Sequence, residues 1–245
     1  MSRNGDGAGP AEQRGDEMSD IGLARRVEET ALGEGASLVG FASMAGLAEL
    51  PRAVVFAVRH SPEVFGDPDE MPTPGYYQEY LEFNSRLDAT ARKVADLLRA
   101  EGHSVRVNCA TLGQIDRETL AAPFSHKMAA TRAGLGWIGK SALLVTPQFG
   151  PALRLVSLLT DAPLSVGEAV TESECGECTA CRTACPGRAI TGESWRAGRP
   201  RHEIYDAFAC QKAALERAAR LGVETTICGV CMAVCPRRPR MRLPA

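Results

Sequence analysis

A run of closely spaced cysteines constrains this chain more than any other feature of its sequence. The run covers residues 175–186 and ends on a Cys-Pro step, as does a second set near the end of the sequence. One further cysteine lies between the two sets. These eight cysteines are Cys175, Cys178, Cys181, Cys185, Cys210, Cys228, Cys231 and Cys235. Because no apolar leader segment precedes them, so many thiols indicate a reducing cytoplasm and metal ligation.

The spacing of the run predicts two iron–sulfur clusters. It reads C-x2-C-x2-C-x3-C-P, which is typical of bacterial two-cluster ferredoxins, where the fourth cysteine ligates the other cluster. We therefore assign the first [4Fe–4S] cluster to Cys175, Cys178, Cys181 and Cys235. The second cluster takes the other four cysteines, Cys185, Cys210, Cys228 and Cys231. No local spacing supports Cys210.

Other cysteine chemistries fit this pattern less well. Zinc sites usually use two C-x2-C pairs separated by a loop, and the triple run with its two Cys-Pro steps departs from that pattern. A thioredoxin-like C-x-x-C explains two cysteines and leaves the others without a role. The ninth cysteine, Cys109, falls in a predicted strand, and we expect a small buried hydrophobic side chain there.

Charge and hydropathy exclude several classes of partner. The formal net charge is −2, which gives no overall attraction to nucleic acid or to an anionic membrane surface. No apolar run approaches the roughly 20 residues of a membrane span. The basic run at Arg237, Arg238, Arg240 and Arg242 is more typical of a solvated terminus than of a phosphate site.

The pattern along the chain predicts a layered domain followed by a small cysteine module. We expect a disordered segment at 1–18, an α/β or α+β domain at 19–168 and a two-cluster module at 169–245. Apolar periodicity predicts helices at 20–32, 76–100, 125–132 and 203–220, and strands at 37–42, 53–58, 105–109, 142–146 and 153–160. Surface roles are expected for His60 and His103, which follow a strand and a helix.

A glycine motif lies just before the last two strands. Gly134, Gly136 and Gly139 match G-x-G-x-x-G, but the dinucleotide fold needs a strand before this motif and a helix after it. Here a helix precedes it and a strand follows. Two interpretations remain open: a tight structural turn, or a loop that lets the backbone approach a flat cofactor beside Trp137 and Lys140.

The segment 133–140, Ala-Gly-Leu-Gly-Trp-Ile-Gly-Lys, followed by an apolar strand and the double cysteine module, resembles epoxyqueuosine reductase. This cobalamin-dependent iron–sulfur family acts in tRNA queuosine maturation and is similar in architecture to reductive dehalogenases. The resemblance runs from about residue 20 to the end and includes the sequence Tyr-Tyr-Gln-Glu-Tyr at 76–80.

The resemblance implies a nitroreductase-like domain that holds a corrinoid, joined to a ferredoxin-like module that supplies electrons. By position, cofactor contacts are expected from Gly134, Gly136, Trp137, Gly139, Lys140 and Ser141. A ferredoxin or flavodoxin would donate the electrons. The hard chemistry would belong to the cofactor.

Two departures from the family bear on function. The proton-donating aspartate of the family falls on Leu120, which cannot transfer a proton, and Asp116 and His126 are the nearby substitutes. The helical-repeat extension used beside tRNA is missing after Pro236, so tRNA binding is doubtful. We expect a corrinoid-dependent reductase of a small molecule or modified nucleoside. The alternatives are a ferredoxin-type electron carrier without catalysis and, with less support, an RNA-associated protein.

Overall fold

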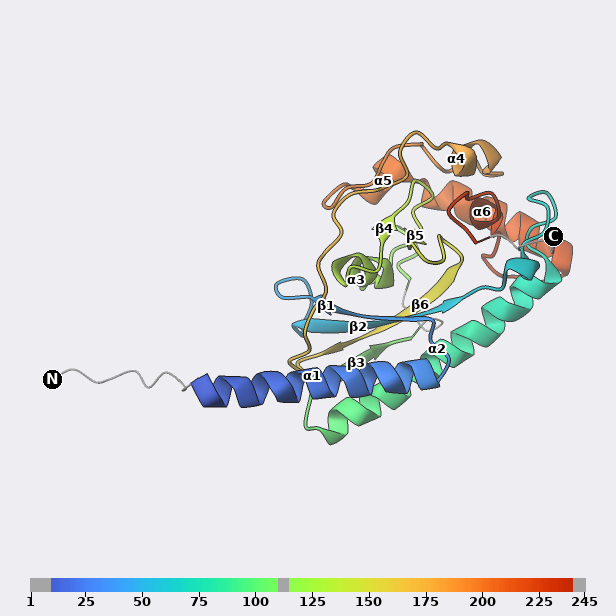
Figure 1. Cartoon of the computed structure of the whole chain (residues 1–245). Coiled ribbons are helices and arrows are strands. Elements are labelled where there is room, and N and C mark those ends of the chain that lie inside the picture. The colour runs from blue at the N-terminus through green and yellow to red at the C-terminus, as the bar shows by residue number, and fades with distance from the viewer. Residues whose placement is uncertain (1–9, 110–114, 240–245) are drawn as a thin grey trace, which may run out of the picture.

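A four-stranded antiparallel sheet forms the centre of the N-terminal domain (Figure 1). The structure, a computed structural model, describes residues 10–109 and 115–239, with side chains from residue 21 onward. The strand order is β1 (Leu38–Ser43), β2 (Arg52–Arg59), β6 (Leu153–Thr160) and β3 (Val105–Asn108), and each strand is antiparallel to its neighbours. The strands predicted at these places are confirmed to within one or two residues.

The two central strands are buried because both faces of the sheet are covered. Along β2, Val54 and Phe56 pack into one apolar cluster, while Ala53 and Val55 pack into another on the opposite face. A strand enclosed in this way has a nearly continuous apolar sequence rather than an alternating one, as 53–58 does. This central sheet gives the domain a mixed α/β architecture.

Two long helices cover the first face of the sheet (Figure 1). They are α1 (Pro10–Gly33) and α2 (Pro74–Ala100). The start of α2 is fixed because the side chain of Thr73 accepts a hydrogen bond from Tyr76 N. The start of α1 corrects the prediction, since the helix continues back through residues expected to be disordered. Proline is well tolerated in the first turn of a helix, and the glutamates and alanine after it favour helix.

The opposite face carries the shorter elements. Helix α3 (His126–Arg132) packs there, followed by a hairpin of β4 (Trp137–Ile138) and β5 (Leu144–Val145). The prediction placed a strand at 142–146 and missed β4, which lies inside the glycine motif. Figure 1 shows the cysteine-containing segment lying over this hairpin and α3, away from α1, while the start of α2 reaches it through the contact of Tyr76 with Met232.

The cysteine module consists of short helices joined by turns. These are α4 (Ala180–Ala184), α5 (Arg201–Ile204), α6 (Ala207–Ala218), the 3-10 turn η2 (Ala219–Leu221) and α7 (Val230–Ala233). The predicted helix at 203–220 is interrupted, because Asp206 accepts hydrogen bonds from Phe208 N and Ala209 N and starts α6 anew. As predicted, this helix carries Cys210.

Arginines of the module hold it against the first domain by reaching backbone carbonyls. Arg217 is 7% exposed and donates to the carbonyl oxygens of Met71 at 2.6 Å, Pro68 at 2.7 Å and Asp69 at 2.9 Å. Those carbonyls belong to the segment between η1 (Pro62–Val64) and α2. Among the described helices, none is long and apolar enough to cross a membrane.

Candidate cluster and cofactor site

The first group of thiols contains the four cysteines predicted to bind one cluster. Burial raises the pKa of Cys181 to about 11, and the nearby thiols of Cys175, Cys235 and Cys178 raise it further. Burial also raises the pKa of Cys235, with added contributions from Cys175 and Cys178. The chain thus folds back so that the cysteine closest to its end joins the start of the run.

The second group lies beside the first. Burial raises the pKa of Cys231, and Cys228, Cys210, Cys181 and Cys185 raise it further. Cys210, which no local spacing supported, is in this group because α6 carries it toward Cys185. Since Cys181 belongs to the first group and still acts on Cys231, the two groups are close neighbours. The ligand assignment itself remains a prediction.

The cysteine side chains form no bond with one another and share no common ion position in the part of the chain that the structure describes. All nine cysteines are free. Within residues 10–109 and 115–239, no three His, Cys, Asp or Glu side chains converge on the position of one ion. A tetrahedral zinc site needs such convergence, with sulfurs about 2.3 Å from the metal. A four-iron cubane spreads its thiolates over four corners, so neighbouring but separated thiols suit it better. Cys109 is only half-buried, at the end of β3.

The glycine motif is a close-packed turn. A Cβ on Gly136 would lie 2.1 Å from the carbonyl oxygen of Val145, within the β4–β5 hairpin, and one on Gly134 would lie 2.7 Å from Glu168 O. Gly139 faces the first thiol group, since its Cβ would lie 3.4 Å from Cys175 Sγ. These contacts favour the structural interpretation of the motif.

The side chains next to these glycines connect the two domains. Lys140, 7% exposed, donates from Nζ to Gly176 O at 2.7 Å, beside the first cysteine of the run. Trp137 is 1% exposed, and the guanidinium of Arg237 lies 5.4 Å from its ring centre. Arg238 likewise lies 4.6 Å from the ring centre of Phe65, so these two arginines pack onto aromatic rings. Arg240 and Arg242 lie outside the described residues.

A large cavity lies between α3, the hairpin and the module. Its volume is about 970 Å³, at the upper end of the range of ligand sites. The walls come from residues 120–132, 142–144, 151–155, 169–171 and 195–204 and from Met232. None of the six predicted cofactor contacts, Gly134, Gly136, Trp137, Gly139, Lys140 and Ser141, is among the described lining residues. The neighbouring Ile138 and Ala142 line the cavity instead, and the cofactor contacts remain predictions.

The predicted proton donors lie in different surroundings. Leu120, where the resemblance would place the family's aspartate, lines the cavity with φ +51°. Asp116 is exposed and caps its own turn, accepting from Glu118 N and Thr119 N. His126 lines the cavity and hydrogen-bonds Ser157 Oγ at 2.7 Å through Nδ1. Burial lowers the pKa of His126 to about 4, so this imidazole is neutral at pH 7.

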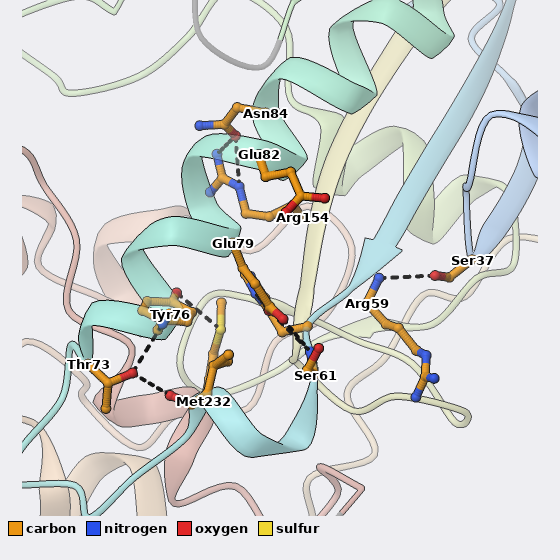
Figure 2. A network of polar contacts seen from close by, with 12 residues as sticks. Ser37, Arg59, Ser61, Thr73, Tyr76, Glu79, Glu82, Asn84, Arg154 and Met232 are labelled. Atoms are coloured by element: carbon orange, nitrogen blue, oxygen red, sulfur yellow. Dashed lines mark hydrogen bonds and ion pairs between the residues drawn. The ribbon is translucent and has the colours of Figure 1, made fainter.

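A second buried histidine was predicted to lie at the surface. The side chain of His60 is fully buried, and its Nδ1 lies 2.8 Å from Glu79 Oε2. Tyr76 packs against it with ring centres 4.9 Å apart and donates to Met232 Sδ at 3.5 Å, next to Cys231 (Figure 2). Glu79 is three residues after Tyr76, so both side chains lie on one face of α2. This spacing is the sequence feature that could have indicated a polar site for His60. His103 remains half-buried, 3.5 Å from Asp161.

Comparison with known proteins agrees with this geometry. Residues 174–238 match the family model described as "4Fe-4S double cluster binding domain". Epoxyqueuosine reductase from Vibrio cholerae is 35% identical over 125 residues, which cover 47% of this chain and 31% of that protein. The Escherichia coli protein is 31% identical over 169 residues, or 67% of this chain and 42% of that protein. The chain is an epoxyqueuosine reductase-like iron–sulfur protein.

Solved structures share the fold of this epoxyqueuosine reductase-like chain. A crystal structure of epoxyqueuosine reductase has a TM-score of 0.58 at 18% identity, covering 89% of this chain and 66% of the other. A catabolic reductive dehalogenase has a TM-score of 0.62 at 20% identity, over 86% of this chain and 31% of the other. The aligned parts amount to less than half of the curated relatives' lengths.

Proposed function

We propose that this protein is a reductase in which two [4Fe–4S] clusters deliver electrons to a corrinoid in the cavity. One observation carries the proposal: the module that contains both thiol groups also forms a wall of the cavity. Met232, the neighbour of Cys231, and Ile204, close to Cys210, both line it. Electrons leaving the second cluster therefore have a short path into the cavity. The substrate is a small molecule or a modified nucleoside.

The thiol groups fit the clusters they would hold. Each group supplies four sulfurs, one for every iron of a cubane, and the groups are close enough for their charges to interact. We assign Cys175, Cys178, Cys181 and Cys235 to the first cluster. The second takes Cys185, Cys210, Cys228 and Cys231. Burial lowers the pKa of Lys127, and the nearby Cys210 and Cys231 raise it, so a negatively charged second cluster would favour the cationic form of this lysine.

The cavity offers room and apolar contact surface for a large, flat cofactor. Its volume of about 970 Å³ exceeds what a small substrate needs, and its walls are mainly aliphatic. Leu143, Leu144 and Leu153 would hold one side of a corrinoid, and His126 and Met128 another. When bound, the corrinoid supplies the strongly reducing centre. Lys127 keeps a proton at Nζ, where it donates to Ala142 O at 2.6 Å, and the leucines exclude water.

The electron donor is an external protein of the ferredoxin or flavodoxin type. Every assigned cysteine is only partly buried, which leaves both clusters near the surface of the module. The exposed face of α6 carries Phe208, 52% exposed, and Leu215, 43% exposed, one heptad apart and close to Cys210. Such an apolar patch beside a redox centre suits a transient electron-transfer contact.

A second function, electron carriage without catalysis, is favoured by one observation. The cavity position of the family's acid is Leu120, and the described lining residues include no aspartate or glutamate. A carrier has no need of a proton donor. In this alternative the clusters pass electrons to a partner enzyme and no corrinoid is bound.

Anaerobic reconstitution with iron, sulfide and hydroxocobalamin separates these functions. We expect about eight irons per chain and a corrinoid that stays with the protein through gel filtration. Ala122→Trp, at the cavity wall, should reduce corrinoid retention and leave the iron count unchanged. Ala219→Trp, exposed on η2, is the matched control. Eight irons with no retained corrinoid would favour the carrier, and zinc without sulfide would overturn the cluster assignment.

A further inference from the structure

The cavity carries an uneven distribution of charge. Five of its described lining residues are basic, and none is aspartate or glutamate. The basic residues come from separate parts of the chain: Lys127, Arg132, Arg154, Arg199 and Arg201. The rest of the wall is largely apolar. Four of these residues are half-buried and Arg201 is exposed. Cations that share one cavity repel one another unless opposite charge accompanies them, so the partners of these five residues decide what the cavity can bind.

Two of the five cations are already matched by negative charge. Arg199 forms ion pairs with Glu193 at 3.1 Å and Glu203 at 2.9 Å. Lys127 lies close enough to Cys210 and Cys231 for their charges to act on it, so the second cluster would be its counter-charge. The charges of Arg199 and Lys127 therefore give no reason to expect an anionic ligand.

The other three cations donate hydrogen bonds to neutral oxygens. Arg132 donates from Nε to Ser43 O at 2.6 Å, and Arg201 donates from Nη1 to Leu120 O at 2.8 Å. Arg154 donates to the amide oxygen of Asn84 at 2.6 and 3.0 Å (Figure 2). Its guanidinium also lies 4.5 Å from the ring centre of Tyr80. These bonds fix the direction of each guanidinium without neutralising it.

One buried acid lies close to the cavity without lining it. Asp88 on α2 is 5% exposed, and its charge raises the pKa of His126 against the larger effect of burial. Asp88 is not among the described lining residues. Arg132 and Arg201 are bonded elsewhere, to the carbonyls of Ser43 and Leu120, so the positive charge of these two arginines remains.

We infer that the cavity binds an amphipathic anion, an apolar body with a carboxylate or phosphate group held by Arg132 and Arg201. This inference deepens the proposed function, because it names the chemical class of the ligand. It rests on the proposed function only for the reaction that the ligand would undergo. Guanidinium groups suit such anions because they make paired, charge-assisted hydrogen bonds. Two sources share this chemistry: the substrate, and the phosphodiester of a corrinoid nucleotide.

The test compares two probes that differ only in charge, 1-naphthoate and 1-naphthamide. Binding is measured by calorimetry to the full-length, cluster-loaded protein without corrinoid and without turnover. We expect naphthoate to bind at least tenfold more tightly and to weaken as salt is raised. Arg132→Gln should weaken naphthoate binding about tenfold, the loss of one charge-assisted hydrogen bond, and leave naphthamide binding unchanged. Equal affinities for the two probes would overturn the inference.

Further variants separate charge recognition from folding. Arg132→Lys keeps the positive charge and should retain most of the naphthoate affinity. Arg25→Gln, on exposed α1 and away from the cavity, changes net charge equally and should have no effect. If Arg25→Gln weakens naphthoate binding as much as Arg132→Gln does, the loss reflects the overall charge of the protein. The assignment of the anion to Arg132 would then be wrong.

A competition arm identifies the source of the anion. Displacement of naphthoate by hydroxocobalamin but not by cobinamide, which lacks the nucleotide, assigns the cations to the corrinoid phosphodiester. Naphthoate that binds alongside hydroxocobalamin assigns them to the substrate. The affinities for naphthoate and naphthamide are measured without corrinoid. They can therefore be interpreted even if the protein fails to retain a corrinoid.

Discussion

Replacing Gly136 by alanine should destabilise the fold whether or not any cofactor is present. The new Cβ would lie 2.1 Å from Val145 O, where real Cβ atoms keep at least 3.0 Å, and 2.9 Å from Val145 C. The atom in the way is a backbone carbonyl of the paired strand, which cannot rotate aside as a side chain can. Relief requires β4 and β5 to separate, although both strands are buried.

The magnitude follows from the cost of overpacking. Inserting a methyl group into a close-packed site costs about 1–3 kcal/mol, and a clash with rigid backbone belongs at the upper end. At roughly 2–4 °C per kcal/mol for a chain of this size, we expect the thermal midpoint to fall by about 6–12 °C. Gly102→Ala is the control, because Gly102 has φ +87° and no atom within 4 Å of the place that a Cβ would take. It should cost only about 1 kcal/mol.

The assay is thermal unfolding followed by circular dichroism, under anaerobic conditions and with the clusters loaded. Corrinoid retention is measured on the same samples. A Gly136→Ala protein that unfolds within about 2 °C of the wild type while losing corrinoid would refute the reasoning. The glycine would then serve a ligand rather than the turn.

Three further predictions concern the module and the cavity. Cys185→Ala should remove the cluster held by Cys228 and Cys231 and lower the iron count from about eight to about four, whereas Cys109→Ala should change neither; selective loss of the Cys175 cluster would contradict this. His126 takes up a proton near pH 6.5 when unfolded and only near pH 4 when folded, so stability should fall by up to about 3 kcal/mol on acidification between those values. Urea midpoints at pH 7 and pH 5 should therefore differ less in His126→Gln than in the wild type, and equal differences would count against it. Arg217→Met should cost about 1–3 kcal/mol, because it leaves the buried carbonyl of Met71 unpaired and removes the partly buried bonds to Pro68 and Asp69, and faster proteolysis at 66–73 would report it, with Arg217→Lys intermediate.

The sequence predicted most of the sheet because its central strands have a strong local signal. The continuous apolar run of β2 leaves little alternative to a buried strand. The hairpin of β4 and β5 has two residues per strand, too few for any period, and its signal was the glycine spacing that suggests a nucleotide loop instead. Asp206 is a capping residue that the sequence displayed, yet the apolar pattern on either side masked the break between α5 and α6.

Long-range packing accounts for the rest of the difference. The burial of His60 depends on aromatic rings from a separate helix, which no local pattern contains. Cys210 joins the second thiol group only because α6 runs back across the run of cysteines. The cavity is likewise assembled from separate stretches of chain, so its basic surplus has no counterpart in the net charge of −2.

The arginines that attach the module to the first domain recognise the shape of the backbone rather than particular side chains. Arg217 reaches the carbonyls of residues 68–71, and Arg201 reaches the carbonyl of Leu120. Any residue that adopts the left-handed backbone of Leu120 presents that same oxygen, so the side chain facing the cavity can be exchanged without loosening the assembly. The attachment of the module to the first domain can thus be kept while the side chain that faces the cavity changes.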